Sequence, residues 1–256
     1  HRELSKKELD IADKLIIEDT EIEPYVLDYS SIDEKLVTDE FGEKLPTTYE
    51  FSKFSREHCN VDIGDPDDAL VKWIDQETRF FNIITKRQIE KRVEEGFESA
   101  DDFINYAVSL TNKRRSRMGL SFENHIEALL QAWEISYDRN PITEGTSRPD
   151  FIFPSILDYQ NPDFPSNFLT MLGAKSTCKD RWRQVLKEAD RIDHKHLCTL
   201  ERGISVDQTA EMKNENLTLV IPEPFQITYT DEQQDDIMSL GEFLEEVEEK
   251  QRRITD

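Results

Sequence analysis

Three residues that lie far apart in the chain carry side chains that could together cleave a phosphodiester bond. Asp150 begins the apolar run "DFIF", Lys175 follows the apolar run "FLTMLGA", and Glu188 lies thirteen residues beyond the lysine. Mg²⁺ prefers oxygen ligands, and a cation near a phosphate stabilises the charge that develops during hydrolysis. The set therefore predicts metal-assisted phosphodiester hydrolysis, with Asp150 and Glu188 holding Mg²⁺ and Lys175 stabilising the developing charge.

Each of these residues also has an ordinary structural explanation. A Pro-Asp pair usually marks a turn, and a lone lysine on a strand is usually a solvent-facing edge residue. The three residues in the order strand-Asp, strand-Lys, helix-Glu are together more informative than any one of them alone. If the two apolar runs pair as antiparallel strands, Asp150 and Lys175 emerge at one edge of the sheet. A helix after the second strand could then fold back and direct Glu188, in its third turn, to the same metal.

A second pattern follows the lysine directly. Lys179, Asp180 and Arg181 would occupy the first turn of that helix. A helix N-terminus in the major groove places such side chains against base edges. Lysine and arginine donate to guanine O6 and N7, and aspartate accepts from cytosine N4. The triplet is therefore a candidate reader of a G·C-rich step, and a helix start with an internal ion pair is the alternative.

Further basic residues could contact the DNA backbone. Arg183 lies in the same expected helix, and Arg115 and Arg117 belong to the cluster "KRRSR". Contacts with phosphates position a protein on DNA without reading its sequence. The alternative for the "KRRSR" cluster is a solvated helix end.

The overall charge of −23 at first argues against nucleic acid, because an acidic surface repels a polyanion. The charge is segregated, however. Residues 111–195 contain 13 Lys and Arg against 12 Asp and Glu, a net charge of +1, so the remainder carries −24. A local basic face on an acidic body is compatible with double-stranded DNA as a partner.

The composition also indicates the cellular compartment in which the protein is expected. The three cysteines are widely spaced and odd in number, which predicts neither a disulfide framework nor a CxxC metal pair and suits a reducing cytoplasm. No run of eighteen apolar residues occurs, and the first residues contain no apolar segment of a signal peptide. We therefore expect a cytoplasmic protein with no membrane partner.

The hydrophobic periodicity predicts the elements that must position these side chains. Helices are expected over residues 66–95, 99–118, 122–135, 179–192 and 205–216, with a break at Gly119 and a new N-cap at Ser121. Strands are expected within residues 148–156, 168–177, 195–200 and 217–224. The C-terminal residues 239–253 are expected to form a helix or a charged tail. This order predicts a mixed α/β domain over residues 111–256, preceded by a mostly helical subdomain over residues 1–110.

Four segments of the chain resemble a known family. The segments "RPDFIFPS", "LGAKSTCKDRWRQVLKEADRI", "KHLCTLERGIS" and "TLVIPEP" are similar to the catalytic domain of EcoRII-type type II restriction endonucleases, which belong to the PD-(D/E)xK nuclease superfamily. The resemblance is dense over about residues 114–225. It implies a mixed central sheet flanked by helices.

The resemblance also assigns roles. Asp150, Lys175 and Glu188 match the residues that bind Mg²⁺ and catalyse cleavage, and residues 179–181 match the triplet that contacts the outer C·G pairs. It implies a homodimer that cuts a short, nearly palindromic site, typically CCWGG, and that extrudes the central bases. Stacking residues for this step would come from the helical part, where Trp73, Phe51 and Phe54 are candidates and burial in the core is the alternative. The founding members carry an additional N-terminal effector domain, and we expect this chain to be too short to hold it.

Other interpretations remain open from the residues. A nuclease of the same fold could act in repair and read a mismatch. A non-catalytic DNA-binding module could keep the fold, although the intact Asp150, Lys175 and Glu188 argue against it, and an acidic scaffold protein has only the net charge in its favour. Glu123 and Glu127 lie four residues apart on one helix. They could orient water near the metal or simply form a solvated pair.

Overall fold

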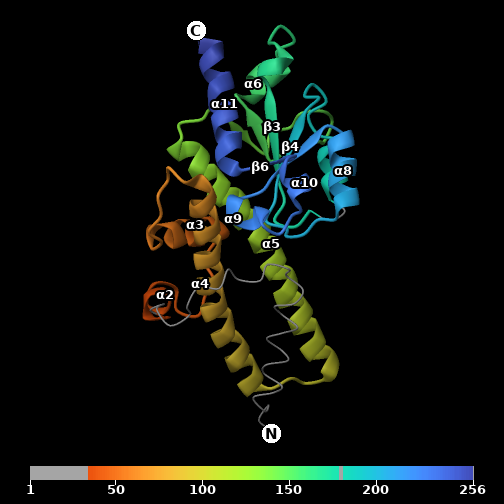
Figure 1. Ribbon diagram of the computed structural model, residues 1–256. Helices are drawn as coiled ribbons and strands as arrows, with labels where there is room; N and C mark the ends of the chain where they lie inside the picture. The colour runs from red at the N-terminus through yellow and green to blue at the C-terminus, as the bar shows by residue number, and fades with distance from the viewer. Residues whose placement is uncertain (1–33, 179–180, 256) are drawn as a thin grey trace.

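The computed structural model describes residues 34–178 and 181–255 of the chain (Figure 1). Its strands are β1 (Asp138–Arg139), β2 (Phe151–Phe153), β3 (Thr170–Ala174), β4 (Lys195–Cys198), β5 (Leu217–Val220) and β6 (Ile237–Met238). Its helices are α2 (Glu34–Phe41), α3 (Thr48–Glu57), α4 (Pro66–Glu95), α5 (Ala100–Ala132), α6 (Ile156–Gln160), η2 (Ser166–Phe168), α7 (Trp182–Val185), α8 (Val206–Asn214), α9 (Glu223–Gln226), α10 (Asp231–Gln234) and α11 (Leu240–Thr255).

The six strands form one mixed sheet in the order β1-β2-β3-β4-β5-β6. The first three strands pair antiparallel, and the pairs from β3 to β6 are parallel. Every residue of β2, β3 and β4 is buried, as expected for strands covered on both faces. The predicted strands and the antiparallel pairing of the first two long ones are therefore confirmed.

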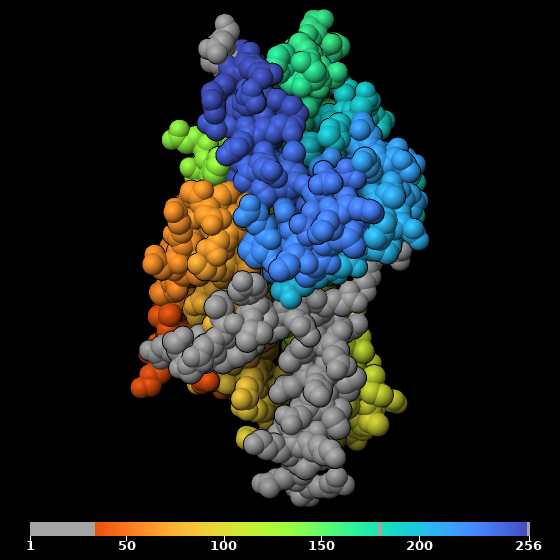
Figure 2. All heavy atoms as spheres, in the orientation of Figure 1, coloured from red at the N-terminus to blue at the C-terminus, as the bar shows by residue number. Residues whose placement is uncertain are grey.

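Helices cover both faces of this sheet. On one face, Phe243 of α11 packs against Phe153 and His196, with ring centroids 5.8 and 5.1 Å away. On the other face, α7 packs against the backbone of β3, because Gly173 leaves room for Val185. A Cβ added at Gly173 would lie 3.0 Å from Val185 Cγ2. In the space-filling view the blue C-terminal elements form much of the surface that faces the viewer (Figure 2).

The helical part is built on two long helices, α4 and α5, which extend away from the sheet side by side (Figure 1). Asp65 caps α4 by accepting from Asp68 N, and Ser99 caps α5 by accepting from Asp102 N. The sheet end of α4 belongs to the main core. Farther along, α4 joins α2 and α3 in a second core of Val37, Phe51, Phe54, Phe80, Phe81 and Ile84.

Two of the helix predictions were wrong. The break predicted at Gly119 does not occur: α5 continues through it, and the Ser121 hydroxyl donates to Glu77 Oε2 at 2.7 Å instead of capping a helix. A glycine inside a helix costs only about 1 kcal/mol, which the packing of the buried Phe122 can offset. The predicted boundary between residues 110 and 111 falls inside α5, and the division into two domains remains a prediction.

The helix predicted over residues 179–192 is limited, where the structure describes it, to the four residues of α7. Ala189 adopts a φ of 53°, which a continuing helix cannot accommodate. The buried Trp182, Val185 and Ala189 share the spacing of an amphipathic helix, but packing against the sheet, not helix propensity, decides their conformation. Glu188 therefore lies in a turn and not in the third turn of a helix.

Candidate active site

Asp150 and Lys175 meet where β2 begins and β3 ends. Residue 151 pairs with residue 172, so the antiparallel register places Asp150 opposite Gly173 and makes Lys175 its diagonal neighbour on the same face. Asp150 is 5% exposed, and its Oδ2 accepts from Ala174 N and Lys175 Nζ, both at 2.6 Å. Lys175 N in turn donates to Cys198 O at 3.0 Å. The carboxylate and the ammonium group are thus held by the sheet itself.

Glu188 faces the same two charges. Its pKa is raised to about 7, chiefly by burial, while Lys175 lowers it and Asp150 raises it further. Within the described residues its Oε2 is buried and has no hydrogen-bond partner. A buried carboxylate oxygen without a donor is costly, and a bound cation or a water molecule could satisfy it. The structure therefore brings Asp150, Lys175 and Glu188 into one electrostatic environment.

These residues suit a divalent cation with hard oxygen ligands. Mg²⁺ is commonly held by one or two carboxylates, with water and substrate phosphate in its other positions. The unsatisfied oxygen of Glu188 and the carboxylate of Asp150 supply such a pair. Among residues 34–178 and 181–255, no group of three or more His, Cys, Asp or Glu side chains is arranged to hold a metal. With two carboxylates, the protein would contribute part of the coordination shell of such an ion.

Of the three predicted base-reading residues, the structure describes Arg181, which is the N-cap residue of α7. Lys179 and Asp180 fall outside the described residues. Arg181 is exposed, and its Nη2 donates to Thr177 O at 2.8 Å. Arg183 is also exposed, and its Nη2 contacts both carboxylate oxygens of Glu211 at 2.7 Å. Both arginines can therefore be reached from solvent, as contact with DNA requires.

The two arginines predicted on α5 differ in their surroundings. Arg115 is exposed. Arg117 is partly buried, and its guanidinium lies 5.4 Å from the Phe51 ring centroid while its Nη1 donates to Pro46 O at 2.7 Å. Burial lowers the pKa of Arg117. These contacts are those of a cation that stabilises the helical core, and they do not support contact between Arg117 and DNA.

The candidate stacking residues Trp73, Phe51 and Phe54 are between 0 and 9% exposed, which agrees with the alternative that they belong to the core. Glu123 and Glu127 form ion pairs with Arg139 of β1 at 3.0 and 2.6 Å. These pairs attach α5 to the strand beside Asp150.

Two features of the site were missed by sequence reasoning. One is the backbone N–H of Ala174, which no side-chain pattern reveals. The other is Glu201, which follows β4, is 6% exposed and accepts from Cys178 N at 2.5 Å. Glu201 thus fixes the backbone of Cys178, the residue directly before the predicted base-reading triplet. An acidic residue placed directly after the buried strand segment "KHLCTL" was the available signal, since buried carboxylates are rare unless they are hydrogen-bonded.

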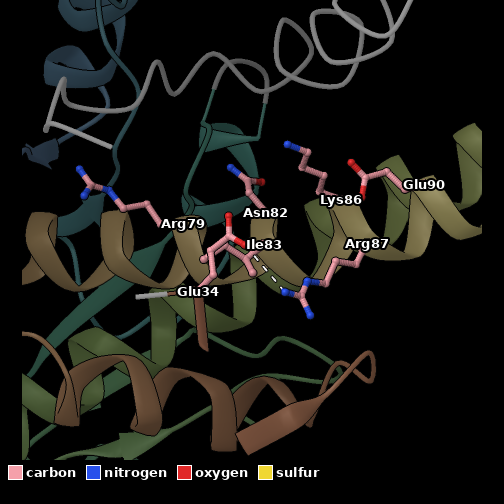
Figure 3. Close-up of a pocket in the computed structure, with 7 residues that line it drawn as sticks. All are labelled: Glu34, Arg79, Asn82, Ile83, Lys86, Arg87 and Glu90. Carbon is pink, nitrogen blue, oxygen red and sulfur yellow. Dashed lines mark ion pairs between the residues drawn. The ribbon is translucent and has the colours of Figure 1, made fainter. Parts of the chain in front are cut away.

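A surface hollow in the helical part contains none of these residues (Figure 3). Side chains of α4, among them Lys86 and Arg87, project into it, and Arg87 pairs with Glu34 at 3.8 Å. The hollow has charged groups of both signs.

The mixed sheet, with an aspartate and a lysine at the adjoining ends of two antiparallel strands, defines a protein of the restriction-endonuclease-like fold. Residues 81–244 match the family model described as EcoRII C terminal. The chain belongs to this family, as its sequence motifs indicated.

Comparison with individual proteins gives the same result. Over 205 residues the chain is 37% identical to the type II restriction enzyme EcoRII of Escherichia coli, covering 80% of this chain and 51% of that enzyme. It thus spans about half the length of this relative. Two solved structures share the fold at low identity. Metal-depleted Ecl18kI in complex with uncleaved, modified DNA has a TM-score of 0.65 and 19% identity, covering 87% of this chain and 85% of that one. The PspGI–substrate DNA complex has a TM-score of 0.64 and 18% identity, and the match covers 89% of this chain and 98% of the PspGI chain.

No helix in the described part of the chain is both long enough and apolar enough to cross a membrane.

Proposed function

We propose that this protein is a Mg²⁺-dependent type II restriction endonuclease that cleaves double-stranded DNA at a short CCWGG-like site. The observation that carries the proposal is the ion pair of Asp150 and Lys175 at one edge of the sheet, together with the buried Glu188 carboxylate, whose pKa both of these charges influence. Membership of the EcoRII C-terminal family and the fold shared with two DNA-bound restriction endonucleases support it.

Each of the three side chains has a distinct task in this reaction. Asp150 and Glu188 would hold Mg²⁺, which when bound supplies a Lewis acid and lowers the pKa of a coordinated water. Lys175 lies 2.6 Å from Asp150 Oδ2 and would stabilise the negative charge that develops on the phosphate. Glu188 must give up its proton to become a ligand, so its raised pKa makes metal binding weaker at low pH.

Recognition of the site would depend on the start of α7. Lys179, Asp180 and Arg181 would contact the outer C·G pairs, and Arg183 and Arg115 would contact phosphates. Because the proposed target is nearly palindromic, a homodimer would present the same residues to both halves.

Digestion of unmethylated plasmid DNA tests the proposal. With Mg²⁺ the protein should produce discrete fragments, with EDTA none, and mapping the cut ends in a random-sequence library should give a CCWGG-like site. Asp150→Ala, Lys175→Ala and Glu188→Ala should each abolish cleavage and leave specific binding largely intact. Lys213→Ala, which removes an exposed ion pair with Asp236, serves as the control and should cleave normally.

Other results would reject the proposal. A repair nuclease would leave intact plasmid uncut and cleave mismatched duplexes. A non-catalytic module would bind DNA without cutting it under any metal condition. Cleavage by any of the three alanine variants at a rate near that of the unmodified protein would remove the assigned site.

A further inference from the structure

The position of Glu188 is not determined by regular secondary structure. It lies between the end of α7 and the start of β4, in a segment that turns at Ala189, where φ is 53°. Its own backbone N–H donates to Val185 O at 3.1 Å, and the preceding Lys187 O accepts from Ser147 Oγ at 3.3 Å. A carboxylate on such a segment stays in place only if the residues that follow it are anchored.

Arg191, three residues after Glu188, provides this anchor. Its guanidinium donates to four backbone carbonyls at the end of α6 and in the loop beyond it: Asp158 at 3.4 Å, Asn161 and Phe164 at 2.8 Å each, and Tyr159. A guanidinium carries five N–H donors in a rigid fork, which suits several carbonyls at once, and a cation is favoured at the C-terminal end of a helix.

The side chain of Tyr159, in α6, also contacts Arg191. The Tyr159 hydroxyl accepts from Arg191 N at 3.2 Å and donates to Glu144, and the Tyr159 ring centroid lies 5.7 Å from the guanidinium carbon. Tyr159 is 3% exposed. Because α6 connects β2 to β3, this cluster ties the Glu188 segment to the two strands that carry Asp150 and Lys175.

We propose that Arg191, together with Tyr159, is a positioning residue for the Glu188 carboxylate and thereby for the metal site. This inference rests on the proposed function, since it takes Glu188 as a metal ligand. Partners of metal ligands that lie outside the coordination shell typically change metal affinity or activity by about 10- to 100-fold when they are replaced.

The test compares Arg191→Ala, Arg191→Lys and Tyr159→Phe with Arg92→Ala. Arg92 is a matched control, because it also donates to a carbonyl beyond a helix end, that of Gly96, and lies over an aromatic ring, that of Phe97. It belongs to the far end of α4. The readouts are Mn²⁺ affinity by calorimetric titration of the protein, backbone hydrogen exchange over residues 186–192, and binding of specific DNA without metal.

Arg191→Ala should weaken Mn²⁺ binding by about 10- to 100-fold and speed exchange over residues 186–192, with metal-free DNA binding unchanged. Arg191→Lys and Tyr159→Phe, which preserve more of the packing, should give smaller changes in the same direction. If Arg191→Ala does not fold, the proposal is tested with these two variants. Arg92→Ala should leave Mn²⁺ affinity unchanged.

The outcomes separate the two proposals. If Glu188→Gln lowers Mn²⁺ affinity while the Arg191 and Tyr159 variants do not, only the positioning role is refuted. Equal losses in Arg92→Ala and Arg191→Ala would show a general effect of destabilisation and would also refute it. If Glu188→Gln itself leaves Mn²⁺ affinity unchanged, the metal site of the proposed function fails, and the positioning role fails with it.

Discussion

The buried carboxylate of Glu188 should make the metal-free protein less stable at alkaline pH. Burial raises its pKa from 4.5 to about 7. The folded state therefore holds the proton more tightly than the unfolded state. The stability that this proton contributes is complete below pH 4.5 and is lost as the pH rises through about 7. Glu188→Gln removes the titration and should be stabilising above that pH.

The magnitude follows from the shift. The difference between 7 and 4.5 is 2.5 pH units, and at 1.36 kcal/mol per unit this corresponds to about 3 kcal/mol. The side chain is only partly buried, so solvent screening reduces the effect, and we expect about 1–2 kcal/mol. Urea denaturation in EDTA at pH 5 and pH 8.5 measures it: the stabilisation by Glu188→Gln should be larger at pH 8.5 by this amount.

A control is needed because the chain carries a net charge of −23, and removing any negative charge relieves repulsion. Glu245→Gln makes the same change at an exposed position of α11. If the two variants show the same difference between pH 5 and pH 8.5, burial of Glu188 has no energetic consequence and the reasoning is refuted.

Three further predictions concern the residues around the site. Arg181→Ala should cost about 1–3 kcal/mol of discrimination at one base pair, measured by competition binding, whereas an equal loss on random DNA would mark a phosphate contact. Arg117→Ala should lower the denaturation midpoint without changing affinity for specific DNA, because its contacts are with Pro46 and Phe51; a loss of affinity alone would restore the predicted DNA role. Gly173→Ala should destabilise the protein by about 1–3 kcal/mol in urea, because the new Cβ lies 3.0 Å from Val185, and an unchanged midpoint would show that α7 shifts freely.

The strand part of the site could be predicted from the sequence because its geometry is local and periodic. Once two apolar runs pair antiparallel, the register places the residue before one strand near the residue after the other. Asp150 and Lys175 therefore needed only the correct strand prediction. The register places Asp150 opposite Gly173, so Lys175 is its diagonal neighbour on the same face, within reach of a long side chain.

The segment around Glu188 could not be predicted in the same way. The spacing of Trp182, Val185 and Ala189 fits a helix, and all three are buried, yet the chain turns at Ala189. What decides its path is a set of contacts with distant residues, including the carbonyls beyond α6 that Arg191 binds. A pattern of hydrophobic residues shows which side chains are buried, but it does not reveal such contacts.

The two proposed metal ligands are therefore held by different means, and their charges are balanced in different ways when no metal is bound. In the metal-free protein Lys175 neutralises Asp150, while Glu188 keeps its proton up to about pH 7. The site can thus be close to neutral without a metal, although it contains two carboxylates. A divalent cation held by Asp150 and Glu188 would replace the proton on Glu188 and would compete with Lys175 for the carboxylate of Asp150. A weaker ion pair with Asp150 would leave the Lys175 ammonium group available for its proposed task, which is to stabilise the charge on the phosphate.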